Sequence, residues 1–220
     1  EGSTLTLTQT TFTDSNTSDT HTAIVDWGDG TTSTATVIES ATSGSVTASH
    51  LYKDDEDSPF TVKVTVTDNL GAPHTDSFQL IVNNVNPTLT PGSDQTINKG
   101  ATLTLAPATF GDVGALDTHS AVIVWGDGVH ETVAVNQSAG TVSGSHTYNA
   151  DGTFYPTIVV VDDDGGLVVG SFKATVGTGG PLPTLPNTTF GALALLTSAF
   201  IILLVWRRRQ RARRDGEPAN

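Results

Sequence analysis

The chain has 220 residues and a formal net charge of −13, and it contains neither cysteine nor methionine. The lack of cysteine excludes disulfides and cysteine-bound zinc. Residues 207–220 hold six arginines and two acids, whereas residues 1–206 hold four lysines and 21 acids. Because residues 1–206 are strongly acidic, they repel the phosphates of nucleic acids, and we expect no nucleic-acid partner. Without methionine at the start, we expect the sequence to be a piece of a longer protein.

A duplication sets the domain organisation. Residues 2–30 match residues 100–128 at 16 of 29 positions without a gap, and both segments end in Trp-Gly-Asp-Gly. Later motifs recur at offsets that fall from 98 to 94, and the changes lie between motifs, as happens when loops change length and strands do not. Self-similarity at a fixed offset indicates tandem units, so we predict two similar domains.

Most of the sequence before residue 190 has the pattern of half-buried strands. Apolar and polar residues alternate around Leu5 and Leu7 and along 62–67, and threonine and valine dominate, which is typical of β-structure. Gly-Asp-Gly and Asp68–Gly71 are tight-turn sequences. The strands expected in the first domain are 4–8, 21–27, 32–38, 45–51, 60–67 and 75–82, with a matching set in the second. Such short antiparallel strands predict β-sandwiches with Trp27 and Trp125 in their cores.

The segment between the copies is interpreted as a linker. Residues 87–99 lack periodicity and are rich in turn residues. The first domain is therefore expected at 1–86 and the second at 100–177.

One strand of the second copy has an unusual pattern. Aligning residues 155–161 with residues 60–66 places Pro156, Ile158 and Val160 on the outer face of that strand. Two interpretations of this apolar face stay open: it covers a neighbouring segment or molecule, or it is covered by its own loop.

The ordered motifs resemble a known family. They are Asp26-Trp27-Gly28-Asp29-Gly30, His50-Leu51-Tyr52 and a Thr67–Gly71 turn in the first copy, and Trp125-Gly126-Asp127-Gly128 and His146-Thr147-Tyr148 in the second. This order resembles the PKD (polycystic kidney disease) repeat. The resemblance covers residues 2–86 and 100–177 and implies immunoglobulin-like β-sandwiches, as found in bacterial and archaeal surface proteins and secreted hydrolases. It also implies that these motif residues are structural.

The C-terminal region predicts a membrane anchor. The pentapeptide Leu185-Pro186-Asn187-Thr188-Thr189 precedes an uncharged run at 190–206 and the basic tail at 207–220. As a helix, the run spans roughly 25 Å, the short limit for crossing a bilayer. Arginines favour the cytoplasmic side. We therefore predict a spacer at 178–189, a transmembrane helix at 190–206, a cytoplasmic tail at 207–220 and an extracellular body.

This three-part pattern resembles a cell-wall sorting signal of the LPxTG type. The resemblance implies that a sortase cuts after Thr188 and joins its carboxyl group to cell-wall peptidoglycan. Thr189 stands where that family has glycine. The alternative is a plain single-pass membrane anchor in which Leu-Pro-x-Thr is a coincidence. Both interpretations attach the chain to the outer face of a bacterial-type envelope.

Few residues indicate catalysis or ion binding. Adjacent strand residues point to opposite faces, so Ser49-His50 and Ser145-His146 are not expected to pair as nucleophile and base. His21 and His119 also recur, but a metal site needs three or four converging ligands. The acidic turn Asp162, Asp163 and Asp164 is the first candidate for Ca²⁺, since oxygen ligands from loops suit that ion. The alternative is that the recurring aspartates only shape turns.

The function expected from these patterns is mechanical. We expect no enzyme activity, and we expect the two sandwiches to act as a spacer or adhesion scaffold in the C-terminal stalk of a cell-surface protein. One alternative is a module that binds polysaccharide or an extracellular protein. Another is the accessory tail of a surface-attached protease or glycosidase.

Overall fold

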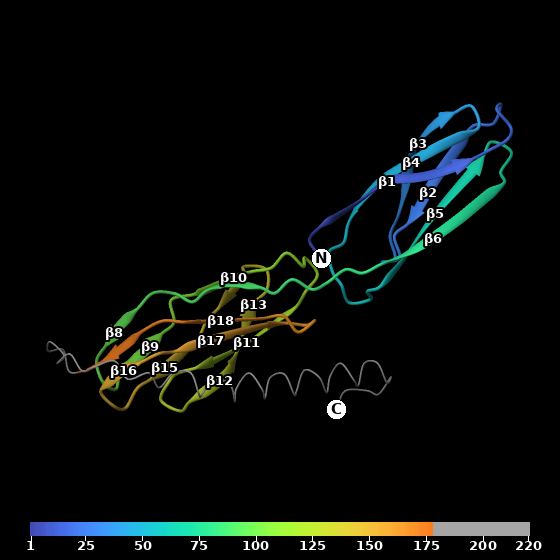
Figure 1. Ribbon diagram of the computed structural model, residues 1–220. Helices are drawn as coiled ribbons and strands as arrows, with labels where there is room; N and C mark the ends of the chain where they lie inside the picture. The colour runs from blue at the N-terminus through green and yellow to red at the C-terminus, as the bar shows by residue number, and fades with distance from the viewer. Residues whose placement is uncertain (178–220) are drawn as a thin grey trace, which may run out of the picture. The chain divides into compact units, whose positions relative to one another are not determined.

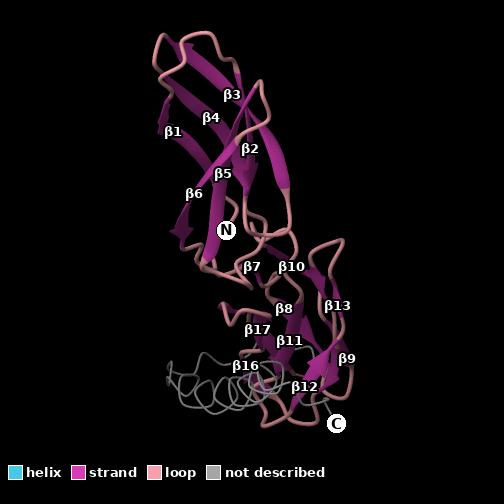
Figure 2. Cartoon of the chain, turned by 90° about the vertical axis from the view of Figure 1, so that its right-hand side faces the viewer, coloured by secondary structure: helices cyan, strands magenta, loops and turns pink. Residues whose placement is uncertain are grey.

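The computed structural model describes residues 1–177, and its regular structure there is entirely β-strand (Figures 1 and 2). The all-β class is therefore confirmed. Contacts divide the described residues into two compact units, Glu1–Val85 with Val113–Leu116, and Asn86–Asp112 with residues 117–177. The predicted spacer, sorting motif, membrane helix and tail lie outside the described residues. Among residues 1–177, no helix has the length and hydropathy to cross a membrane.

The first unit is a two-layer antiparallel sandwich in the order β1-β4-β3-β2-β5-β6. Its strands are β1 (Thr4–Thr13), β2 (His21–Asp26), β3 (Thr32–Ser40), β4 (Ser43–Leu51), β5 (Phe60–Asp68) and β6 (Pro73–Leu80). The first half of β3 pairs with β2 and the second half with β4, so β3 passes from one layer to the other. This order leaves β1 and β6 as the two edge strands.

The core of the first unit lies between the layers. Leu7 and Val46 come from the β1–β4 layer, and Val25 and Val62 come from the other. Along β5, buried residues alternate with more exposed ones, as expected for a strand with one face on a core. Trp27 follows β2 and is 1% exposed, among the largest side chains of the core.

The second unit repeats this plan with shorter strands. One layer contains β13 (Val135–Asn136), β14 (Thr141–Val142), β10 (Ala108–Gly111) and β7 (Thr88–Thr90). The other contains β12 (His130–Val133), β11 (His119–Val124), β17 (Thr157–Asp162) and β18 (Leu167–Ser171). Two smaller ladders are formed by β15 (Ser145–Thr147) with β9 (Thr102–Thr104), and by β16 (Gly152–Phe154), β19 (Ala174–Val176) and β8 (Gln95–Ile97). Trp125 is completely buried in this core.

Residues 87–99, expected to form a linker, instead contribute two strands to the second unit. β7 pairs with β10, and β8 pairs in parallel with β19. Each strand has only three residues, too few to show a period of two, and each has partners distant in sequence. Periodicity therefore gave no signal, and the turn residues around these strands dominated the pattern.

The register of β17 corrects the expected outer face of that strand. In the ladders, Val25 pairs with Val64 and the equivalent Ile123 pairs with Ile158, so the true offset is 94 rather than 95. A shift of one residue reverses the two faces of a strand. Ile158 and Val160 therefore belong to the core. The opposite face carries Val159 and Val161, which are 1% and 5% exposed.

Candidate functional site

One cluster of side chains recurs in both units and contains most of the motif residues. We call it the Trp–His–Tyr cluster; in the first unit it consists of Trp27, Asp29, His50 and Tyr52. The His50 ring stacks on Trp27 at 5.0 Å and meets Tyr52 edge-on at 4.7 Å. His50 Nε2 lies 2.6 Å from Asp29 Oδ2, and the Tyr52 hydroxyl donates to the Trp27 carbonyl at 2.8 Å. The histidine, the aspartate and the tyrosine of the motif thus each contact a partner inside the unit.

The second unit reproduces this geometry with Trp125, Asp127, His146 and Tyr148. The rings of Trp125 and His146 stack at 5.1 Å, and His146 Nε2 lies 2.7 Å from Asp127 Oδ2. The Tyr148 hydroxyl donates to the Trp125 carbonyl at 2.8 Å. The side chains of the motif therefore link the turn after β2 or β11 to the end of β4 or β15.

The Gly-Asp-Gly turn beside this cluster brings the backbone at Gly28 close to the backbone of Thr61. Gly28 has a φ of +84°, and a Cβ there would lie 2.8 Å from the Thr61 carbonyl oxygen. Asp29 Oδ1 accepts hydrogen bonds from the Thr31 amide and hydroxyl, which close the turn. Glycine is thus required twice over at position 28, by backbone conformation and by space.

Burial and hydrogen bonding shift ionisation in the cluster. Burial raises the pKa of the Asp29 carboxyl, but hydrogen bonds from Thr31 and His50 outweigh it and hold that pKa below its ordinary value of 3.8. Burial, with the charges of Asp29 and Asp26, raises the pKa of Tyr52 to about 12. Burial also raises the pKa of Tyr148. These tyrosines are therefore neutral hydrogen-bond donors at physiological pH.

The other recurring histidines are also held by neighbours in their own unit. His21 Nε2 lies 3.0 Å from Asp14, and its Nδ1 lies 3.2 Å from Glu39. His119 has the same contacts at 3.0 Å with Asp112 and at 3.2 Å with Gln137. Both ring nitrogens thus face oxygen atoms. The sequence singled out these histidines, and Asp14 recurs with His21 at one offset, but the pattern did not pair the two residues.

The candidate Ca²⁺ turn does not bring its three aspartates to one point. Asp162 Oδ1 accepts the amides of Asp164 and Gly166 and so closes the hairpin, as Asp68 does in the first unit. Asp163 accepts the amide and the hydroxyl of Thr118. Among residues 1–177, no group of three metal-competent side chains unites these aspartates. The turn-forming alternative accounts for the contacts of Asp162.

A different acidic group gathers in the first unit. Carboxylate oxygens of Glu1, Asp54 and Asp55 lie within 4.8 Å of one another. Sequence reasoning did not select this group because Glu1 is far from the other two along the chain.

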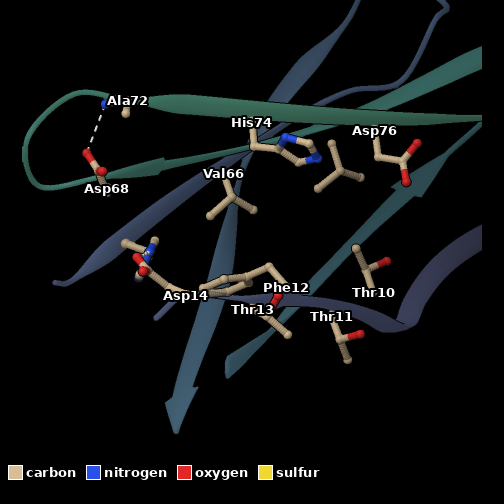
Figure 3. A pocket seen from close by; sticks show the side chains of 12 residues that line it. Thr10, Thr11, Phe12, Thr13, Asp14, Val66, Asp68, Ala72, His74 and Asp76 are labelled. Carbon is tan, nitrogen blue, oxygen red and sulfur yellow. Dashed lines mark hydrogen bonds and ion pairs between the residues drawn. The ribbon is translucent and has the colours of Figure 1, made fainter. Parts of the chain in front are cut away.

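The first unit also has an open groove of about 490 Å³ along the free edge of β1 (Figure 3). Thr10–Asp14 line one side, and Val66 lies between them and the other side. The other side is lined by Asp68, Ala72, His74 and Asp76. Its size falls within the roughly 300–1,000 Å³ typical of ligand clefts. Nothing in the local sequence pattern marks this groove.

Solved structures with immunoglobulin-type modules resemble this chain. One is the PKD domain of an M14-like peptidase from Thermoplasmatales archaeon SCGC AB-540-F20, with 24% identity over 42% of this chain and 94% of that one, and a TM-score of 0.35. Another shows fibronectin(III)-like modules of Clostridium thermocellum CbhA, with 16% identity over 85% and 92% of the two chains and a TM-score of 0.35. A third shows tandem Ig repeats of Dlar, with 11% identity over 71% and 82% of the two chains and a TM-score of 0.28.

No protein-family model matches the sequence, and no curated protein matches it. These three structures are less than 25% identical to the chain, and their TM-scores are below 0.5.

Proposed function

We propose that the two units are PKD-like spacer modules in the stalk of a protein attached to the outer face of a bacterial-type envelope. The observation that carries this proposal is the Trp–His–Tyr cluster, present in both units with the same geometry. Its aromatic rings pack on one another, and its histidine, aspartate and tyrosine bond within the unit. A motif used in this way stabilises its module, because its histidine and aspartate contact each other. A non-enzymatic role fits it best.

The spacer proposal is tested by exchanging the modules. The chain would be displayed on cells with an N-terminal epitope, and antibody-coated beads would measure how well the epitope is reached. Replacing one unit with an unrelated β-sandwich of equal length should leave bead binding unchanged, whereas deleting one unit should reduce it. If the exchange lowers binding as much as the deletion does, the modules have a specific binding role instead.

Attachment is a separate part of the proposal and rests on the residues after 177. We propose that Leu185–Thr189 acts as a sorting motif, that 190–206 crosses the membrane and that the arginine-rich tail stays inside. Mass spectrometry of the C-terminus from fractionated cells tests this directly. A C-terminus at Thr188 linked to cell-wall peptide would support sortase and peptidoglycan as partners. An intact basic tail in the membrane fraction would show a plain single-pass anchor, and recovery in the medium would contradict both.

A further inference from the structure

The second unit has an apolar face on the outer side of one layer. In this layer β12, β11, β17 and β18 lie side by side (Figure 1). The ladders place Val122, Val159 and Val169 in one row, because Val159 pairs with Val122 on one side and with Val169 on the other. We call the apolar residues of this side the outer apolar face; they are Val122, Val124, Val159, Val161, Leu167 and Val169.

The first unit has polar residues at the equivalent positions. Thr65 and Thr75 lie in the middle row, and their hydroxyls are hydrogen-bonded at 2.8 Å. In the next row, Lys63 Nζ lies 3.6 Å from Asp26 Oδ2. Polar pairs of this kind suit a sheet face that is covered by water. The outer apolar face of the second unit does not suit water in the same way.

Burial shows where the outer apolar face is covered. Val159 and Val161 are 1% and 5% exposed, although neither belongs to the core cluster. The described strands that pair with β17 are β11 and β18, which lie in the same layer and therefore flank these side chains. Val169 of β18, in contrast, is 42% exposed. A strand buried on both sides is typical of a sheet between two other layers, so the burial indicates a third layer over β11 and β17.

We propose that this third layer is the chain's own apolar run, residues 190–206, which packs against the outer apolar face while the chain is outside a membrane. The run is uncharged, and burying its apolar surface is favourable in water. As a helix it spans roughly 25 Å, whereas a layer of four strands is about 15–20 Å wide. One helix is therefore long enough to cross the layer.

The position of the run in the sequence supports this occupant. Residues 178–189 separate it from the last strand of the second unit, and a segment of that length extends up to about 40 Å. The run can therefore reach any part of the outer apolar face. This inference goes beyond the proposed attachment, because it concerns the chain before the run enters a membrane.

The test makes use of the lack of cysteine in the chain. The full chain receives Thr132→Cys and Ser198→Cys, and mild oxidation at micromolar concentration is followed by non-reducing gels and mass spectrometry. Thr132 is exposed and pairs with Val122, and Ser198 lies within the run. We expect an intramolecular disulfide that forms at least about tenfold faster in detergent-free buffer than in micelles, because docking raises the effective concentration of the two thiols.

The first unit supplies the matched control for this cross-link. Thr34 pairs with Ile24 as Thr132 pairs with Val122, and both threonines are exposed. The pair Thr34→Cys and Ser198→Cys should form its disulfide slowly, and at the same rate in buffer and in micelles.

Threonines copied from the first unit test the face itself. Val159→Thr with Val161→Thr introduces the residues found at Thr65 and Thr67, so we expect the second unit to stay folded, which its melting curve checks. The two changes should slow the disulfide in buffer at least about fivefold, because they remove apolar contacts at the centre of the face. Ile24→Thr is the control, since Ile24 is 53% exposed on the same side of the first unit, and it should have no effect.

Several results would overturn the proposal. They are equal rates in buffer and in micelles, an equally fast disulfide in the control pair, or no slowing by the two threonines. A loop of the second unit would then cover Val159 and Val161. A disulfide that forms as fast between singly substituted chains would assign the cover to a second copy instead. The proposed attachment is judged separately, because it is read from the C-terminus of protein recovered from cells.

Discussion

The two units agree closely in their Trp–His–Tyr clusters and diverge at the edge of β1 or β10. The distance between histidine and aspartate is 2.6 Å in one unit and 2.7 Å in the other, and that between tyrosine and the tryptophan carbonyl is 2.8 Å in both. In these clusters each side chain is held by several others, so a change in one residue disturbs the rest. Duplicated sequences can diverge more freely where a residue has few partners.

The divergent edge illustrates this freedom. Gly170 lies under Leu89 and Pro91, where a side chain would collide. Asp76, at the equivalent position, lines an open groove and is exposed. A side chain is therefore tolerated at the position of Asp76, where no strand equivalent to β7 lies over it among the described residues, but not at Gly170, which β7 covers.

The largest expected effect concerns the part that the units share. Trp27→Ala removes a side chain that is 1% exposed and should lower the free energy of unfolding of the first unit by about 3–5 kcal/mol. Trp125→Ala should do the same in the second unit. Calorimetry of each variant measures the change, with Tyr155→Ala as a control because Tyr155 is 49% exposed. An unchanged melting curve for Trp27→Ala would contradict its role in the core.

The sequence predicted much of this shared part. The expected strands of the first domain each overlap a strand of the structure, because long alternating segments specify their own buried face. Residue type alone was enough to predict that Trp27 and Trp125 lie in the cores and that Gly-Asp-Gly forms a tight turn. The contacts of the histidines with Asp29 and Asp14 could not be derived, since each joins a strand residue to a turn residue distant from it in the sequence.

Other features depended on partners that a local pattern does not reveal. β7 and β8 exist because β10 and β19 pair with them. The predicted register of β17 differs from the observed one by one residue, because a continuous apolar run shows no alternation. All six residues of β17 are buried, so either face could have been the inner one. The groove arises from a pairing that β1 lacks within the described residues, and no single segment encodes it.

A second prediction separates conformation from space at the Gly-Asp-Gly turn. Gly28 and Gly30 share a φ of +84°, but only Gly28 has backbone close to where a Cβ would lie. Gly30→Ala should cost about 1–2 kcal/mol from conformation. Gly28→Ala should cost about 1–3 kcal/mol more, because the added methyl group collides with Thr61. Equal losses in urea denaturation would show that the turn relaxes without penalty.

The third prediction exchanges the residues at the divergent edge. Gly170→Asp places a side chain against Leu89 and Pro91 and should cost about 1–3 kcal/mol. It should also speed hydrogen exchange at the amides of β7 and β10. The reverse change, Asp76→Gly, lines an open groove and should cost only about 0.5–1 kcal/mol, the penalty for glycine in a strand. Similar costs for both changes would mean that β7 does not hold its position firmly.

An electrostatic effect is also expected at Asp29. Hydrogen bonds hold the pKa of Asp29 below its ordinary value of 3.8 despite burial. A carboxyl group whose pKa is lower in the folded state adds stability above its unfolded pKa, and this stability is lost as the pH falls through the folded value. The stabilisation should thus be complete near neutral pH and decline below about pH 4. Asp29→Asn should cost about 1 kcal/mol at pH 7 and reduce the acid dependence of unfolding. Asp57→Asn is the exposed control. An acid profile identical in wild type and Asp29→Asn would show that the contacts with Thr31 and His50 do not favour the charged carboxylate. The cluster would then be held by ring packing and by the tyrosine hydrogen bond instead.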